Sequence, residues 1–241
     1  MVSLKGDKVK KFFLWLLFLL ACFFLFFSEA QAAKSYYPGI KRRLKSYYYQ
    51  LQRKPKPTVK LKTQFHRQEH SLSCEVAALK MALSVKGMNP SESELIRQLP
   101  WQPMWGNPHQ GFVGDINGGM LKTGYGVYWK PIAKIAQRYR PAEAFEHWSV
   151  QRLASEIQRG NPVVVWGYVG SGKRRFWRAP DGTPIWGVSG EHARTVIGFA
   201  GSVTNPQGFF LLDPIYGEIY WNTKSLQSNW APFGNAGVVI R

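Results

Sequence analysis

Helical patterns of hydrophobic residues occupy the first part of the chain beyond residue 62. The stretch "EHSLSCEVAALKMAL" predicts a helix over 74–85 that Ser71 or Ser73 can cap. The stretch "SESELIRQL" predicts a short helix that begins with a capping box between Ser91 and Glu94. Two further helices are predicted in "PIAKIAQRY", which has a proline at its start, and in "VQRLASEIQRG", which ends at a glycine.

The pattern changes to short β-rich runs in the second part of the chain. The segment from Trp101 to Tyr125 is rich in Gly, Pro and Asn and predicts a long loop. Beyond Gly160, runs typical of strands are separated by turns such as "APDGTP" and "TNPQG". These runs are "PVVVWGYV", "HARTVIGFA", "GFFLLDP", "GEIYWN" and "AGVVIR". Helices followed by antiparallel strands predict an α+β domain over 63–241.

The N-terminus has the pattern of an export signal. A basic stretch, "MVSLKGDKVKK", precedes the apolar run "FFLWLLFLLACFFLFF", and small residues at Ala30 and Ala32 fit a cleavage site. We therefore expect residues 1–32 to be a signal peptide, or alternatively an uncleaved membrane anchor. Either reading places the rest of the chain outside the cell, as a secreted protein or on the outer face of the membrane.

Residues 33–62 stand out by their basic composition. The chain of 241 residues has a formal net charge of +18, which favours acidic partners. No acidic residue occurs from Lys34 to Lys62, while Lys, Arg and Tyr recur. We interpret 33–62 as a basic linker or arm that could bind an anionic cell-wall polymer or lipid. Nucleic acid is not an expected partner, because an exported protein seldom meets it.

One cysteine outside the apolar run is the first candidate for chemistry. Cys74 lies at the predicted start of a helix, where the helix dipole favours the nucleophilic thiolate. Such a nucleophile needs a base, usually His, and a group that orients the His. His192 begins a predicted strand, and Asp213 ends the next one, so its carboxylate could accept a hydrogen bond from the imidazole.

The order Cys, His, Asp is similar to the papain-like arrangement, and several stretches resemble the C39-like cysteine peptidase family. They are "HRQEHSLSCEVAALKMAL", "NPHQGFVGDINGGMLKTGYGVYWKPIAKIAQRY", "GNPVVVWGYV", "GEHARTVIGF" and "LLDPIYGEIYWN". The resemblance implies a papain-like fold with the Cys on an N-terminal helical half and the His and Asp on a C-terminal antiparallel sheet. It also implies the triad Cys74, His192 and Asp213, with Gln68 as the oxyanion residue. The implied activity is a thiol protease that hydrolyses amide bonds in a peptide or protein substrate, without a cofactor.

Two other functions fit parts of the sequence. One is a cell-wall amidase or endopeptidase of the NlpC/P60 type, which also uses Cys and then His. The other is a non-catalytic module that binds anionic wall polymer through the basic arm.

Two other kinds of site are disfavoured. His66, His70 and Cys74 could bind zinc if one helix carried them all, but the serines at 71 and 73 indicate that the helix starts later. The phosphate-loop-like stretch "GYVGSGKR" is more typical of a hairpin tip, because no helix can follow it.

Overall fold

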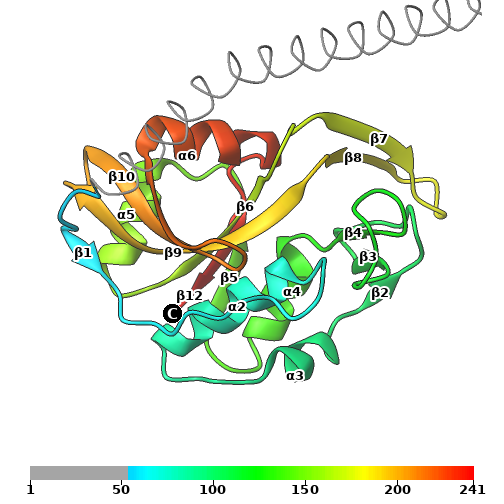
Figure 1. Ribbon diagram of the computed structural model, residues 1–241, viewed down its shortest axis with the longest axis horizontal. Coiled ribbons are helices and arrows are strands. Elements are labelled where there is room, and N and C mark those ends of the chain that lie inside the picture. Colours follow the sequence, from blue (N-terminus) through cyan, green and yellow to red (C-terminus); the bar gives the residue numbers. More distant parts are fainter. Residues whose placement is uncertain (1–53) are drawn as a thin grey trace, which may run out of the picture. The chain divides into compact units, whose positions relative to one another are not determined.

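Five of the strands beyond Gly160 assemble with two earlier segments into one antiparallel sheet, in a computed structural model that describes residues 54–241 (Figure 1). Hydrogen bonds link its strands in the order β11-β10-β9-β6-β12-β5, and β1 also pairs with β9. The strands are β1 (Val59–Lys60), β5 (Ala142–Phe145), β6 (Val163–Tyr168), β9 (Glu191–Gly201), β10 (Pro206–Asp213), β11 (Gly217–Asn222) and β12 (Gly237–Ile240). The predicted signal peptide and most of the predicted linker lie outside the described residues.

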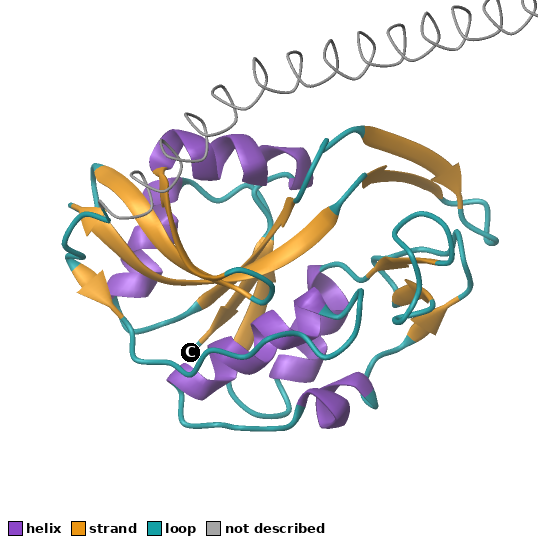
Figure 2. Ribbon diagram, viewed as in Figure 1, coloured by secondary structure: helices purple, strands orange, loops and turns teal. Residues whose placement is uncertain are grey.

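Helices cover both faces of this sheet (Figure 2). One face carries α2 (Cys74–Val85) and α4 (Trp129–Ala136), and the other carries α5 (Val150–Gln158) and α6 (Thr223–Trp230). Successive side chains of a strand point to opposite faces of the sheet, so a strand whose residues are all apolar contributes to the core on both faces. In β6, Val164 and Trp166 join the core on the α2 side, whereas Val163 and Val165 join the core on the α5 side. The central strands are therefore buried on both faces.

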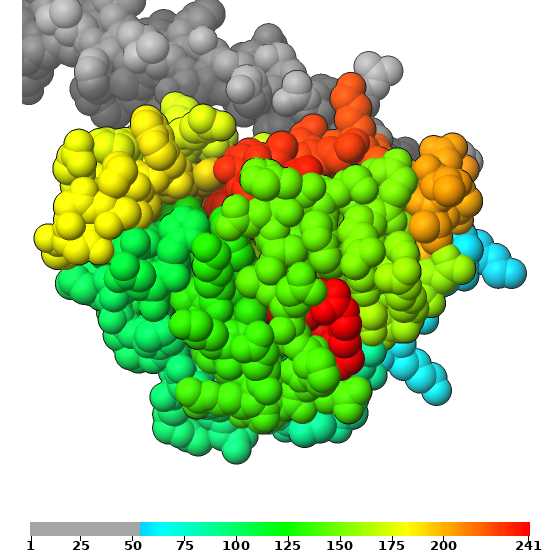
Figure 3. Space-filling model, turned by 180° about the vertical axis from the view of Figure 1, so that it is seen from behind, coloured from blue at the N-terminus to red at the C-terminus, as the bar shows by residue number. Residues whose placement is uncertain are grey.

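Smaller elements lie beside this layered core. Helix α3 (Glu92–Ile96) follows α2, and a three-stranded sheet is formed by β2 (Trp101–Gln102), β3 (Phe112–Gly114) and β4 (Gly124–Gly126). The hairpin of β7 (Arg174–Arg178) and β8 (Pro184–Val188) is yellow and forms one corner of the face shown in Figure 3. The predicted long loop over 101–125 thus contains two short strands and most of a third, with two or three residues in each strand. Strands this short leave no period in the sequence.

Most helix predictions are confirmed. Helix α2 spans the predicted residues, but the hydroxyl of its N-cap Ser73 accepts the backbone N–H of His70 instead of capping the helix. The capping box between Ser91 and Glu94 is present at α3. Helix α4 begins at Trp129, before the proline of its predicted start. The glycine-rich stretch after β6, predicted as a hairpin tip, instead connects β6 to β7, two strands that do not pair; the hairpin tip is the predicted turn "APDGTP" between β7 and β8.

The order of elements is more mixed than the sequence suggested. Strand β5 lies between α4 and α5 in the chain and pairs with the last strand, β12. Helix α6 follows β11 and packs against β10 and β6. The α+β class holds, but helices and strands are not divided into two halves of the chain. In β5, "AEAF" is too short for its alternation to be distinguished from a loop.

The N-terminal end of the described chain belongs to the sheet. Val59 pairs with Phe199, and the N–H groups of Thr58 and Leu61 donate to carbonyls of β9. Residues 58–61, which the sequence analysis assigned to the linker, are therefore an edge of the domain that begins before Thr63. Among the described residues, no helix combines the length and apolar character that a membrane span needs.

Candidate active site

Cys74 is the first residue of α2, and it is buried. Its side chain is 4% exposed, and the thiol donates a hydrogen bond to Glu75 Oε2 at 3.3 Å. Burial raises the pKa of the Cys74 thiol well above its ordinary value, and the nearby carboxyl groups of Glu75 and Glu191 raise it further. The backbone N–H of Ala193 acts in the opposite direction but does not outweigh them. The helix start alone predicted a thiolate, whereas the resting site favours the neutral thiol.

Packing between α2 and β9 brings this thiol to the strand that carries His192. One turn along α2 from Cys74, the carbonyl of Ala78 accepts a hydrogen bond from the Thr195 hydroxyl at 2.7 Å. The Ala193 N–H lies close enough to affect the Cys74 thiol. The hydrogen bond from Thr195 thus holds the first turn of α2 against β9, next to Arg194.

His192 and Asp213 come together through the register of β9 and β10. Leu212 pairs with Thr195 in this antiparallel ladder, so Asp213, the last residue of β10, lies near the start of β9. The Asp213 carboxylate accepts a hydrogen bond from His192 Nε2 at 3.1 Å. Both side chains are buried. Since Nε2 is engaged by the carboxylate, Nδ1 is the ring atom left for a proton transfer.

Electrostatics keep Asp213 ionised and His192 neutral. Burial alone would raise the pKa of Asp213, but the hydrogen bond from His192 and the positive charge of Arg194 lower it well below its ordinary value. Burial lowers the pKa of His192, and Arg194 lowers it further, although Asp213 opposes both. The directions of these shifts favour neutral imidazole and neutral thiol over a thiolate–imidazolium ion pair.

Arg194 is a site residue that sequence reasoning missed. Its Nε donates to Asp213 Oδ2 at 2.7 Å, so Asp213 binds His192 and Arg194 with separate oxygens. The guanidinium also lies over the Trp221 ring, 4.6 Å from its centroid. The signal was available in "EHARTV", because residues two apart in a strand share one face. A buried arginine on the face of His192 needs an acidic partner, and Asp213 supplies it.

Gln68 lies before α2 but does not present a free amide. Its Nε2 donates to the carbonyls of His70 and Ser71 at 2.7 and 3.0 Å, while Oε1 is buried without a hydrogen-bond partner. Its backbone N–H donates to the carbonyl of Pro214, next to Asp213. Both amide hydrogens are thus engaged in the resting site, and a side-chain rotation would be needed to release them.

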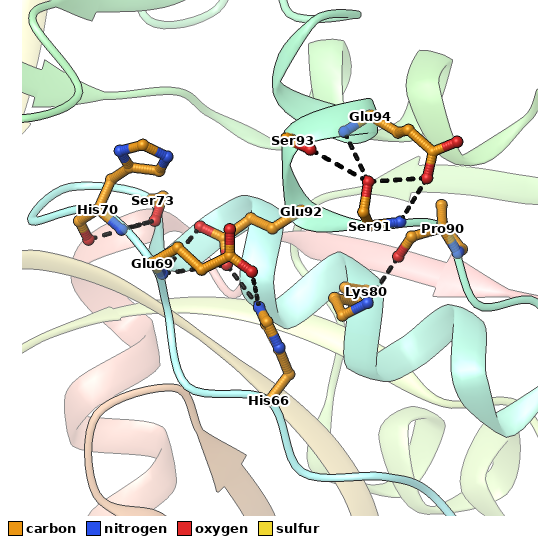
Figure 4. A network of polar contacts seen from close by, with 10 residues as sticks. All are labelled: His66, Glu69, His70, Ser73, Lys80, Pro90, Ser91, Glu92, Ser93 and Glu94. Atoms are coloured by element: carbon orange, nitrogen blue, oxygen red, sulfur yellow. Dashed lines mark hydrogen bonds and ion pairs between the residues drawn. The ribbon is translucent and has the colours of Figure 1, made fainter.

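A buried carboxylate of α3 holds the segment that leads to Cys74. Glu92 Oε2 lies 2.6 Å from His66 Nε2, and both of its oxygens accept the backbone N–H of Glu69 (Figure 4). Figure 4 also shows His70 and Ser73 on the same segment, joined by two hydrogen bonds. The path of the chain from residue 66 to the helix start is therefore held by Glu92 of α3 and by Ser73, the N-cap of α2.

Comparisons with known proteins identify the family of the chain. The model of the Peptidase_C39 like family matches residues 56–238, which is most of the chain. The chain belongs to that family. It is accordingly a cysteine peptidase, a hydrolase, as the sequence analysis predicted. No curated protein matches the chain.

The chain is also similar to several solved structures. A protein from Bacillus anthracis described as a C39-like peptidase has a TM-score of 0.67 at 22% identity, covering 76% of this chain and 96% of its own. The peptidase domain of Streptococcus ComA, a bifunctional ABC transporter, gives a TM-score of 0.45 at 14% identity, with coverage of 73% and 97%. A double glycine motif protease solved with its leader peptide gives 0.43 at 12%, with coverage of 75% and 92%. The first of these supports the fold of this C39-like chain.

The candidate zinc ligands do not converge. His66 pairs with Glu92, His70 Nδ1 lies 2.8 Å from Asn117 Oδ1, and the thiol of Cys74 faces Glu75. Because α2 starts at Cys74, as the serines indicated, His66 and His70 precede the helix and do not share a helical face with Cys74.

A second feature that the sequence did not single out is a pair of buried acids. Glu75 follows Cys74 and Glu191 precedes His192 in the sequence, and both side chains are inaccessible to solvent or nearly so. Burial raises the pKa of Glu75 to about 7, and the pKa of Glu191 is also raised, by burial and by the charge of Glu75. The sequence gives a single indication of them, which is that each glutamate is the direct neighbour of a candidate catalytic residue.

Proposed function

We propose that this C39-like peptidase is exported and hydrolyses peptide amide bonds with Cys74 as nucleophile, His192 as acid and base, and Asp213 as the residue that orients His192. The observation that carries the proposal is the buried hydrogen bond between Asp213 and His192 Nε2 on the strand that packs against the Cys74 helix. It fixes the tautomer whose Nδ1 can accept a proton.

The reaction begins from the neutral pair. As Cys74 Sγ attacks the carbonyl carbon of the substrate, its proton passes to His192 Nδ1, and the carbonyl electrons move to the oxygen. They return when the C–N bond breaks, and the leaving amine takes the proton from His192. A thioester on Cys74 remains, and water hydrolyses it by the same route with His192 as base. Asp213 stabilises the transient imidazolium through its negative charge.

The oxyanion that forms in this reaction needs hydrogen-bond donors. The N–H of Cys74 is one, because the first residues of a helix have no intrahelical acceptor for their N–H groups. Gln68 is the proposed second donor, because it lies on the segment that leads into α2 and its Nε2 is an amide donor. Substrate binding must break its bonds to the carbonyls of His70 and Ser71. Resting geometry of catalytic groups often differs from that of the substrate complex.

Export is proposed on the sequence of residues 1–32, and attachment to an anionic surface on the basic residues that follow. The substrate class is a peptide or protein. The chain belongs to a peptidase family, which favours this class over the cell-wall amidase and the binding module considered above.

The deciding experiment compares the full-length chain with Cys74→Ala on a mixture of unfolded protein substrates and on purified peptidoglycan. We expect cleavage of the protein substrates by the wild type and a loss of about a thousandfold or more in the variant, because members of a catalytic unit contribute together. Ser84→Ala, on the same helix, serves as the control. Cleavage of peptidoglycan alone, or normal turnover by Cys74→Ala, would refute the proposal.

A further inference from the structure

Two buried glutamates form a bridge behind the nucleophile. Glu75 Oε1 accepts the N–H of Val127 at 2.7 Å, and Glu75 Oε2 accepts the thiol of Cys74 at 3.3 Å. The Cys74 sulfur, an oxygen of Glu75 and an oxygen of Glu191 all lie within 4.8 Å of one another. Since Glu75 is on α2 and Glu191 is on β9, the pair joins the two elements that carry Cys74 and His192.

Glu191 has no ordinary partner for its charge. It is 3% exposed, and no donor of the described residues forms a hydrogen bond with either of its oxygens. An oxygen of the Glu75 carboxyl lies within 4.8 Å of an oxygen of Glu191, and interaction with Glu75 contributes to the raised pKa of Glu191. Two carboxylates cannot share a hydrogen bond, but a carboxylic acid and a carboxylate can. One proton shared by the two carboxyls would therefore give a buried oxygen of Glu191 the hydrogen bond that it otherwise lacks.

Among residues 54–241, no other charged or titratable group near the pair neutralises Glu191. Arg194, on the same strand, lowers the pKa of Glu191 but is already bonded to Asp213 at 2.7 Å. The hydroxyls of Tyr125 and Tyr128 bond to each other at 2.9 Å, and Glu191 raises the pKa of both. Cys74 faces the pair from α2, and its pKa is raised in turn.

Strand β4 packs against the two carboxyl groups, in addition to α2 and β9. A Cβ added at Gly126 would lie 2.4 Å from Glu75 Oε1 and 2.7 Å from Glu191 Oε2. This backbone contact, made by a glycine with a φ of 134°, leaves no space for a further side chain over the pair. The site around the two carboxyls is thus tightly enclosed by α2, β9 and β4.

We propose that Glu75 and Glu191 share one proton and act as positioning residues, a carboxylic acid–carboxylate bridge that fixes the start of α2, and so Cys74, against the segment of β9 that carries His192. The inference rests on the proposed catalytic roles of Cys74 and His192. The proton-sharing itself is a property of the folded protein and can be measured without any peptidase activity.

The first test is the infrared spectrum of the full-length chain at pH 7. We expect an absorption band of a protonated carboxyl that disappears in Glu191→Gln, because the amide N–H replaces the shared proton. The matched control is Glu156→Gln, which removes a buried carboxylate that already has Arg152 at 2.8 Å. This control should keep the band. A wild-type spectrum without the band, or a band that survives both Glu75→Gln and Glu191→Gln, overturns the proposal.

The second test is stability against pH. Because the pKa of Glu191 is raised in the folded state, its contribution to stability is present below the unfolded pKa of about 4.3 and is lost as pH rises through the folded pKa. The melting temperature of the wild type should thus fall from pH 5 to pH 9 relative to that of Glu191→Gln, which cannot lose this proton. Parallel pH profiles would contradict the shared proton.

The third test separates positioning from bulk stability. Glu191→Gln should retain hydrolysis at pH 7, whereas Glu191→Ala should lose at least tenfold, because only Gln can restore the bond to Glu75. Equal loss in both variants overturns the positioning role. If neither the wild type nor any variant hydrolyses peptides, the proposed function fails, but the infrared and melting results still decide whether the proton is shared.

Discussion

Arg194 and Asp213 form a buried ion pair, with Nε 2.7 Å from Oδ2. The other carboxylate oxygen accepts hydrogen bonds from His192 and from the backbone N–H of Ile215. Asp213 is therefore fixed by a cation, an imidazole and the turn that follows β10. The ring of His192 is oriented by a carboxylate that cannot itself move freely.

Replacement of Arg194 by Met should affect both stability and pH dependence. Asp213 would lose its buried cation, and removing one partner of such a pair typically costs about 3–5 kcal/mol. Because Arg194 lowers the pKa of His192, its loss should raise that pKa and move the acid limb of the kcat/KM profile to higher pH. The control is Arg152→Met, whose partner Glu156 belongs to α5. An unchanged acid limb would mean that Arg194 serves packing alone.

Asp213→Asn should shift the same limb in the opposite direction. Asp213 raises the pKa of His192, so loss of its charge lowers that pKa and moves the acid limb to lower pH. The rate should fall less than in Cys74→Ala, because an amide oxygen can still accept from Nε2. Asp213→Ala should be slower than Asp213→Asn, since it removes the hydrogen bond too. Comparing pH–rate profiles of the two variants checks this, and identical behaviour to the wild type would assign Asp213 to the turn before Pro214.

The effects of Gln68→Ala on kcat and on the melting temperature distinguish two roles of Gln68. If Gln68 rotates to hold the oxyanion, Gln68→Ala should lower kcat by about 10²–10³. If its amide only ties the carbonyls of His70 and Ser71, the melting temperature should fall while kcat of the remaining folded enzyme stays normal. Steady-state kinetics and thermal unfolding on the same preparation distinguish the two. The matched control is Gln98→Ala, on the segment after α3.

Deletion of residues 34–53 should leave hydrolysis intact and remove salt-sensitive retention on anionic vesicles. Exposed charges are screened over about 8 Å at physiological salt, so retention of the intact chain should weaken as salt increases. The deletion stops before Thr58, because residues 58–61 bond to β9, and a cut at Thr63 would remove part of the sheet. Equal retention of both chains, with or without salt, would show that the arm does not bind the surface.

Local patterns were sufficient for the long elements of the domain. The helix at Cys74–Val85 and the capping box at Ser91 depend on neighbours within one or two turns, and both are present. The buried strands were visible as apolar runs. By contrast, β5 and the strands of residues 101–126 have four residues or fewer, and they form because partners elsewhere in the chain complete their hydrogen bonds. A pattern of so few residues carries no period of its own.

The sequence by itself determined the candidate residues Cys74, His192 and Asp213, because residue type and position at element ends are local properties. Only the tertiary structure decided their state. The helix dipole favours a thiolate at Cys74, but burial and the two glutamates favour the thiol. That balance depends on which side chains from α2, β9 and β4 share a solvent-free space. Distances between residues far apart in the chain determine the free energy of a buried charge, and no local pattern encodes them.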